Sequence, residues 1–333
     1  MADKVTAKDF ASEQEVRWCP GCGDHAIVRN IQKLLADEGA SRHNTAFVSG
    51  IGCAARFPYY MSTYGFHTLH GRAPAFATGA KLANPDLDVW VMGGDGDFLS
   101  IGGNHIIHLI RRNINVTCIL FNNQIYGLTK GQASPTSRIG QKTVTTPDGV
   151  DSQPMNALAL ALGAGGRFIA RTMSDKPKEM LAEFKTAHTI EGTAFVEVLQ
   201  NCTVFNDGAF STFSDRKTGA DHRINVEHGK PMIFGVDGNK GLRVNPKTWQ
   251  MEVVVIGENG ISEDDILVHD ETNLALAEML VRLDMPDFPK VTGVIYNNPA
   301  PAWDVEMDKA YKANEQQDIN GFFDFLKKGS WEV

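Results

Sequence analysis

The sequence has no long apolar segment and few cysteines. None of its apolar runs approaches the roughly 18 residues that a membrane-spanning helix needs, and its first ten residues are polar, whereas a secretory signal has an apolar centre. These absences predict a soluble, cytoplasmic protein with no membrane partner. Five cysteines in 333 residues are too few for a disulfide framework. In a reducing compartment they are better explained as metal-binding or redox residues.

An excess of positive charge is also missing. The formal net charge is −8 and both signs are mixed along the chain, which argues against nucleic acid as a partner. With 333 residues, of which 42% are hydrophobic, the chain can bury a large core. It has room for one large α/β domain with an extension, or for two domains.

The most informative stretch contains two turns that each follow a predicted strand. Residues 88–92 are apolar and lead into Gly94-Asp95-Gly96-Asp97, and residues 116–121 lead into Asn122-Asn123. Glycines let a ligand approach the backbone, and carboxylate and amide oxygens are the ligands that Mg²⁺ prefers. Asp95, Asn123 and one backbone carbonyl would leave room for two phosphate oxygens and a water in a set of about six ligands. The alternative is that each turn, considered by itself, is an ordinary loop that binds no ligand.

Strands and helices alternate through the first 205 residues. The predicted strands are 45–49, 88–92, 116–121, 167–170 and 193–199, and the predicted helices are 25–37, one ending at 83, 99–112, 155–162 and 176–189. This alternation predicts a doubly wound, mostly parallel sheet. Cys53, Asp95, Asn123 and Cys202 each come shortly after a different strand. Ligands of such sheets bind at the carboxyl ends of the strands, so we expect these four residues at one edge.

The cysteine spacing leaves several kinds of site open. Cys19 and Cys22 form a Cys-x-x-Cys pair, while Cys53 and Cys202 are remote single residues. One pair with two singletons is compatible with a four-thiolate iron–sulfur cluster, whereas structural zinc usually takes two local pairs. Spacing alone does not decide between them. A thioredoxin-type redox pair is a weaker alternative because no strand precedes it, and Cys118, inside an apolar strand, is expected to be a core residue.

Two other regions are less regular. Residues 129–153 lack periodicity, and a loop of this length is usually functional or mobile. Lys130, Arg138 and Lys142 in this loop are candidates to meet phosphate or carboxylate groups, or are simply exposed to solvent. From residue 206 the pattern changes, with a hairpin or small sheet expected in 240–258, a helix in 273–283, and an aromatic tail in 321–333 that favours packing against another subunit. We therefore divide the chain into an arm (1–16), a cofactor domain (17–205) and an extension (206–333) that packs on the core and on a partner subunit.

The Gly-Asp-Gly and Asn-Asn turns resemble the thiamine-diphosphate-binding motif of thiamine-dependent enzymes. With Trp18-Cys-Pro-Gly-Cys-Gly23, Gly50-Ile-Gly-Cys53, His70-Gly-Arg-Ala73, Tyr126-Gly-Leu-Thr-Lys-Gly-Gln132 and Asn201-Cys-Thr203, the chain resembles the β subunit of 2-oxoacid:ferredoxin oxidoreductases. The resemblance is strong over roughly residues 15–205 and looser beyond. It implies the diphosphate-binding type of α/β fold and the cofactors thiamine diphosphate, Mg²⁺ and a [4Fe–4S] cluster.

The resemblance also implies roles for individual residues. It implies Mg²⁺ ligation by Asp95, Asn123 and the carbonyl of Ile125, and a cluster on Cys19, Cys22, Cys53 and Cys202. The residues that would contact the diphosphate or the rings are Ile51, Gly52, Cys53, Ala54, His70, Gly96, Asp97, Gly127 and Leu128. Lys130 would lie near the substrate carboxylate, and Lys130 and His70 are the catalytic candidates. His70 as an ordinary loop histidine is the simpler alternative, and His67 is expected to be structural.

The activity implied by the resemblance is CoA-dependent oxidative decarboxylation of a 2-oxoacid to acyl-CoA and CO₂, with electrons passed through the cluster to ferredoxin. We favour 2-oxoglutarate as substrate, then pyruvate. The glutamate that activates thiamine needs a second α/β domain, so an α subunit is expected to supply it in an α2β2 assembly. A non-oxidative thiamine decarboxylase or synthase would leave the cysteines without a role, and a non-catalytic iron–sulfur or zinc module would leave the diphosphate motif without one.

Overall fold

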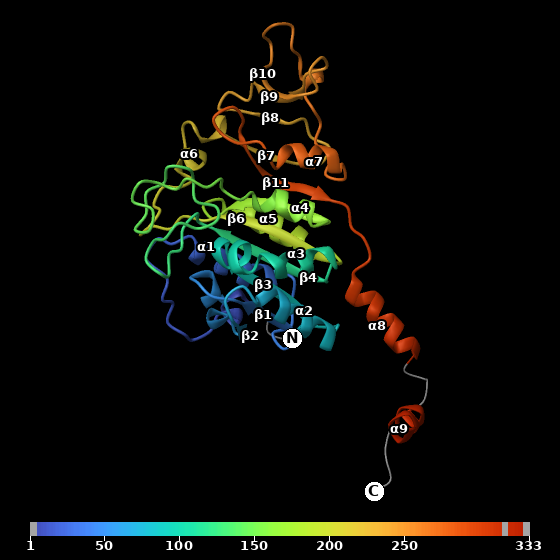
Figure 1. Cartoon of the computed structure of the whole chain (residues 1–333). Helices are drawn as coiled ribbons and strands as arrows, with labels where there is room; N and C mark the ends of the chain where they lie inside the picture. Colours follow the sequence, from blue (N-terminus) through green and yellow to red (C-terminus); the bar gives the residue numbers. More distant parts are fainter. Residues whose placement is uncertain (1–4, 315–318, 329–333) are drawn as a thin grey trace.

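The computed structural model describes residues 5–314 and 319–328. Its centre is an eight-stranded sheet with the order β2-β1-β3-β4-β6-β5-β11-β7 (Figure 1). The strands are β1 (Thr45–Ser49), β2 (Tyr64–His67), β3 (Asp88–Gly94), β4 (Val116–Asn122), β5 (Phe168–Met173), β6 (Thr193–Leu199), β7 (Arg223–Val226) and β11 (Lys290–Asn297). Neighbours from β2 to β5 are parallel, whereas β11 runs antiparallel to β5 and parallel to β7. The predicted mostly parallel α/β sheet is confirmed.

Helices cover both faces of this sheet, as a doubly wound fold requires. The helices are α1 (Asp24–Asp37), α2 (Ala73–Ala83), α3 (Gly103–Arg111), α4 (Ala157–Gly163), α5 (Pro177–His188), α6 (Ser211–Ser214), α7 (Leu274–Leu280), α8 (Trp303–Asn314) and α9 (Ile319–Lys328). The buried side chains of α1 and α5 join one hydrophobic core, and those of α2, α3, α4 and α7 join the other. Among the residues described, no helix combines the length and apolar character needed to cross a membrane.

The strands predicted before residue 205 are all present, and the helices differ at their ends except for one, which is divided. Helix α4 begins at residue 157 and not at 155 because the Asn156 side chain caps it, accepting a hydrogen bond from the Ala159 N–H (3.1 Å). The predicted helix 99–112 is divided. A π-helical turn covers Asp97–Ile101, closed by the Gly102 N–H bonding to the Asp97 carbonyl (3.1 Å), and α3 follows.

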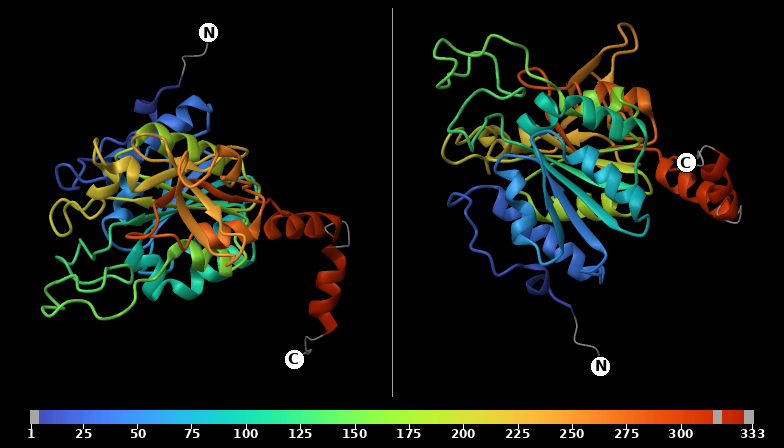
Figure 2. Two further views of the ribbon diagram at one scale, coloured as in Figure 1. Left: turned by 90° about the horizontal axis from the view of Figure 1, so that it is seen from above. Right: turned by 60° about the horizontal axis from the view of Figure 1, so that its bottom comes forward.

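The C-terminal third contributes more to the sheet than the sequence indicated. Strands β7 and β11 extend the central sheet on the β5 side, and both were missed. The expected hairpin is present as β9 (Lys240–Val244) and β10 (Met251–Val255), which form a small sheet with β8 (Ile233–Phe234). Helices α8 and α9 project away from the body (Figures 1 and 2). Residues 1–4 of the predicted arm and 329–333 of the aromatic tail lie outside the described residues.

The strand ends place the polar motifs of the sequence together. Strands β1, β3, β4 and β6 are adjacent and parallel, so their carboxyl ends meet at one edge of the sheet. Cys53 follows β1, Asp95 follows β3, Asn123 follows β4 and Cys202 follows β6. The predicted arrangement of these four residues along one edge is therefore confirmed.

Candidate functional site

A crevice opens at this edge, between the turns that follow β1, β3 and β4. Every residue predicted to contact the cofactor or Mg²⁺ lines it, and so do five residues that were not among the predicted contacts: Asp24, Gly94, Phe121, Tyr126 and Thr129. Lys130, which was predicted to lie near the substrate carboxylate, is not part of the crevice. It is exposed and has a positive φ of 77° in the turn closed by its N–H on the Gly127 carbonyl (3.1 Å).

Asp95 is one of the buried carboxylates of the crevice, 3% exposed. Its Oδ2 accepts a hydrogen bond from the Ser134 hydroxyl (2.6 Å) and lies 2.5 Å from the Thr136 hydroxyl. Burial raises the pKa of Asp95, and the two hydroxyls oppose this rise. Asn123 Oδ1 accepts from the Ile125 N–H (3.2 Å), an Asx turn that fixes the loop after β4. Asp95, Asn123 and Ile125 thus line one crevice, and the carboxylate, amide oxygen and backbone carbonyl that they carry are a donor set that fits a hard divalent cation.

Asp97 holds the walls of the crevice together. Its Oδ1 accepts from the N–H groups of Gly71 (2.7 Å) and Ile51 (3.1 Å), and the Nδ1 of His70 lies 2.5 Å from the same oxygen. A Cβ on Gly50 would lie 2.1 Å from the Asp97 carboxylate, so only glycine fits at that position. The carboxylate therefore orients His70 beside the crevice. Asp97 itself is 2% exposed, which makes it primarily a positioning residue.

The cysteine-bearing segments meet beside the crevice. The Trp18 indole N–H, next to Cys19, donates to the Cys53 carbonyl (2.8 Å). The N–H of Gly23, next to Cys22, donates to the Asn201 carbonyl (3.3 Å), next to Cys202. Two hydrogen bonds therefore tie the Cys-x-x-Cys turn to both remote cysteines. None of these cysteines is in a disulfide, and Cys118 is buried in the core as expected.

Gly127 forms a wall common to the cysteines and the crevice. A Cβ on Gly127 would lie 3.5 Å from the Cys202 sulfur and 3.6 Å from the Cys53 sulfur, and Gly127 also lines the crevice. Burial, the Asp24 charge and the other cysteines raise the pKa of the Cys53 thiol to about 12. Burial also raises the pKa of Cys22, whose sulfur accepts from the Gln200 side-chain amide (3.1 Å). These are protonated thiols unless a metal takes their protons.

Asp24 lies between the two sites. It follows Cys22 by two residues, lines the crevice, and is 1% exposed. Neither of its carboxylate oxygens has a hydrogen-bond partner in the part of the chain that the structure describes. Burial raises its pKa to about 7, partly opposed by the Cys22 thiol beside it. In the sequence, only its position two residues after Cys22 could have indicated that Asp24 belongs to the site.

The remaining candidates lie outside the crevice. Arg138 and Lys142 are exposed, and Arg138 Nε donates to the Gln124 side chain (3.1 Å). His67 contacts the Tyr59 hydroxyl through its Nδ1 (3.0 Å) on the exposed edge strand β2. Across residues 5–314 and 319–328, no three His, Cys, Asp or Glu side chains gather closely enough to hold a single metal ion.

Sequence comparison and structure comparison relate the chain to the same kind of protein. Residues 50–198 match the family described as thiamine pyrophosphate enzyme, C-terminal TPP binding domain. The chain is 52% identical over 264 residues to the 2-oxoglutarate oxidoreductase subunit KorB of Mycobacterium tuberculosis, covering 79% of this chain and 69% of the relative. It is 48% identical over 210 residues to the 2-oxoacid:ferredoxin oxidoreductase 1 subunit beta of Aeropyrum pernix, covering 62% and 65%.

A solved structure resembles the chain over almost its full length. This is the 2-oxoglutarate:ferredoxin oxidoreductase from Magnetococcus marinus with 2-oxoglutarate, coenzyme A and succinyl-CoA bound. The TM-score is 0.79 at 33% sequence identity, and the match covers 99% of this chain and 97% of that chain. The likeness therefore includes the C-terminal third, which lies beyond the matched family domain. The chain belongs to the β subunits of the 2-oxoacid:ferredoxin oxidoreductases.

Proposed function

We propose that this chain, joined to an α subunit, catalyses the CoA-dependent oxidative decarboxylation of a 2-oxoacid to acyl-CoA and CO₂ and passes the electrons to ferredoxin. The observation that carries this proposal is the wall at Gly127, where the cofactor crevice adjoins the cysteine sulfurs. We favour 2-oxoglutarate as substrate, because relatives from Mycobacterium tuberculosis and Methanocaldococcus jannaschii carry that substrate in their names. Pyruvate is the next candidate.

Asp95, Asn123 and the Ile125 carbonyl would hold Mg²⁺ on a diphosphate in the crevice. The Ser134 and Thr136 hydroxyls keep the Asp95 carboxylate in place. When bound, thiamine diphosphate supplies the carbanion that adds to the keto carbon and the ring that accepts electrons on loss of CO₂. Asp97 fixes His70 through its Nδ1, so the second ring nitrogen of His70 is available to a bound molecule in the crevice.

Cys19, Cys22, Cys53 and Cys202 would hold the [4Fe–4S] cluster, one thiolate on each iron. A bound cluster supplies one-electron transfer at low potential. The proposed ligands are supported by the hydrogen bonds that join Trp18 to Cys53 and Gly23 to Asn201. Such ligation would remove the thiol protons that burial otherwise retains.

The α subunit would complete the active site. In the described part of the chain no glutamate lines the crevice, and thiamine activation needs one. The relatives carry the designation subunit beta, which supports a partner chain, and we propose an α2β2 assembly. Lys130, exposed just outside the crevice, would meet the substrate carboxylate in that assembly. We assign residues 17–205 to cofactor binding and 206–333 to packing on the core and the partner.

The proposal is tested by coexpressing the chain with its α subunit and measuring dye or ferredoxin reduction. A panel of 2-oxoacids is assayed with and without coenzyme A. We expect CoA-dependent reduction that is fastest with 2-oxoglutarate, and none from this chain alone. Full activity of the isolated chain would contradict the proposal that an α subunit completes the active site.

The alternatives have different signatures. A non-oxidative thiamine enzyme would consume the 2-oxoacid and release CO₂ without reducing the dye. A zinc module would lack a visible absorption band that dithionite bleaches. Absence of thiamine diphosphate after acid denaturation of the coexpressed complex would contradict the enzyme assignment.

The proposed Mg²⁺ ligands are tested by calorimetry with thiamine diphosphate and Mg²⁺. Asp95→Asn keeps the size of the side chain but removes its charge, so we expect cofactor binding to weaken on the order of 10- to 100-fold. Asp148→Asn, an exposed loop substitution, is the matched control and should bind normally. Equal affinities in the two variants would contradict the assignment of Asp95.

A further inference from the structure

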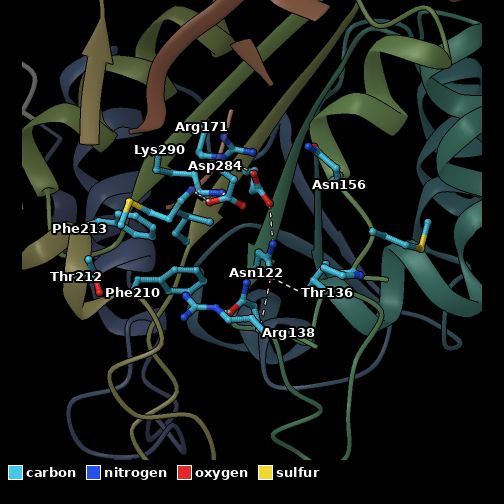
Figure 3. Close-up of a pocket in the computed structure, with 17 residues that line it drawn as sticks. Asn122, Thr136, Arg138, Asn156, Arg171, Phe210, Thr212, Phe213, Asp284 and Lys290 are labelled. Atoms are coloured by element: carbon cyan, nitrogen blue, oxygen red, sulfur yellow. Dashed lines mark hydrogen bonds and ion pairs between the residues drawn. The ribbon is translucent and has the colours of Figure 1, made fainter. Parts of the chain in front are cut away.

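A second cavity of about 430 Å³ lies beside the cofactor crevice, within the size range of small-molecule sites. On one side it is bounded by strands β4, β5 and β6 of the central sheet, and on the other by segments of the C-terminal third of the chain (Figure 3). Its walls come from the loop after β4, from β5 and β6, from residues 210–213 and from residues 284–290. It has no lining residue in common with the crevice, so the inference below does not rest on the proposed function.

The wall formed by β5 and β6 carries a buried ion pair whose acidic partner is fully engaged. Arg171 Nε donates to Glu197 Oε2 (2.6 Å), and the two side chains are 5% and 3% exposed. Glu197 Oε1 accepts from the Asn122 side-chain amide (2.7 Å). Arg171 Nη1 donates to the Val291 carbonyl (3.1 Å), which leaves the guanidinium with further donors. Both carboxylate oxygens of Glu197 are therefore already hydrogen-bonded to other side chains.

Lys290 is a further cation that lines the cavity. Its side chain is 14% exposed, and its ammonium group lies 2.6 Å from Asp284 Oδ2 and 6.0 Å from the centre of the Phe213 ring. Burial, and then the neighbouring charge of Arg171, lower the pKa of Lys290, while Asp284 and then the charge of Glu197 oppose them. The positive charge is therefore incompletely compensated, which favours an added anion.

Asp284, the ion-pair partner of Lys290, interacts with it only weakly. The Asp284 side chain is 60% exposed, so water competes for its charge and the pair contributes little to stability. An anion that enters the cavity can replace this carboxylate and leave Asp284 in solvent. Arg138 stands at another wall and adds positive charge, and the rings of Phe213, near Lys290, and Phe210, beside Arg138, give the cavity apolar surface (Figure 3).

We propose that this cavity binds a small organic anion, whose charged head replaces Asp284 at Lys290 and whose apolar body lies against Phe210 and Phe213. The head is a phosphate or a carboxylate, both of which an ammonium beside a guanidinium recognises.

The test is calorimetric titration of the full-length chain, with thiamine diphosphate and Mg²⁺ in excess, using phenyl phosphate as the probe. Asp284→Asn removes the charge that competes with the probe for Lys290. We expect this variant to bind phenyl phosphate about five-fold more tightly, which is the change in affinity that corresponds to the loss of an exposed ion pair. Lys290→Met should bind at least about ten-fold more weakly. Lys247→Met, which removes an exposed lysine charge elsewhere, should match the unchanged chain.

Further probes separate the head groups from simple apolar binding. Benzoate replaces the phosphate with a carboxylate, and the tighter of the two probes identifies the preferred head. Benzyl alcohol keeps the ring without the charge and should not bind measurably. The proposal is overturned if neither anion binds, if benzyl alcohol binds as well as they do, or if Asp284→Asn does not bind more tightly. The Asp284 variant keeps the test valid should Lys290→Met fail to fold.

Discussion

His188 should make the stability of the protein fall at alkaline pH. Its Nδ1 lies 2.5 Å from Glu38 Oε2 and its Nε2 lies 3.2 Å from Asp88 Oδ1, so one imidazolium joins α5 to the end of α1 and the start of β3. The ring also lies against Trp90 in a tilted arrangement, with 5.0 Å between centroids and 35° between the ring planes. Burial alone would lower the pKa of His188, but the hydrogen bonds and charges of Asp88 and Glu38 outweigh it and raise the pKa to about 9.

The magnitude follows from this shift. A rise from about 6.5 in the unfolded chain to about 9 corresponds at most to roughly 3.5 kcal/mol, at about 1.4 kcal/mol per pH unit. The folded protein holds the proton more tightly than the unfolded chain does. The stabilisation is therefore complete below about pH 6.5 and is lost as pH rises to about 9.

The assay compares the unfolding free energy of the unchanged chain with that of His188→Gln. Glutamine keeps a hydrogen-bonding side chain but cannot titrate, so the difference between the two proteins isolates the imidazolium. We expect this difference to shrink by up to about 3 kcal/mol between pH 6.5 and 9.5. A difference that stays constant over this range, or grows, would refute the reasoning.

Three further substitutions test the neighbourhood of the two sites. Cys22→Ser should abolish the dithionite-sensitive visible absorption, whereas Cys118→Ser should keep it; equal spectra would argue against Cys22 as a ligand. Gly127→Ala would place its Cβ 3.5 and 3.6 Å from two sulfurs, which are ordinary contact distances, so it should keep that absorption and its iron, as should the control Gly103→Ala, which meets nothing within 4 Å; loss of iron from the Gly127 variant alone would contradict this geometry. Glu197→Gln leaves the Arg171 charge buried without its partner and should lower the unfolding free energy by about 3–5 kcal/mol in urea titration; a loss below 1 kcal/mol would be inconsistent with a buried pair.

The strands that carry the site could be predicted because each is an apolar run ended by glycine or a polar pair. The missed strands break that pattern. Strand β2 is exposed at all four residues on the edge of the sheet, and β7 has only four residues within a polar segment. In β11 the register shifts between Val294 and Tyr296, beside Gly293 with a φ of 98°, so its side-chain alternation is interrupted.

The site was predictable where residues follow strand ends, and unpredictable where a loop folds back. Asp95 and Asn123 face one crevice because adjacent parallel strands deliver them there. Ser134 and Thr136 reach Asp95 from a loop without periodicity, across about 40 residues of sequence, and no local pattern indicates such a contact. Likewise, the cysteine order could not show that Gly127 lies against both the crevice and two of the cysteine sulfurs.

The polar contacts that run from Asp95 through Thr136, Asn122 and Glu197 to Arg171 have a practical consequence for protein engineering. A mutant library aimed at the larger cavity would disturb the nearby carboxylate whenever it varies Asn122 or Glu197. Randomising Phe210 and Met285 while keeping these polar residues fixed would reshape that cavity and spare the cofactor.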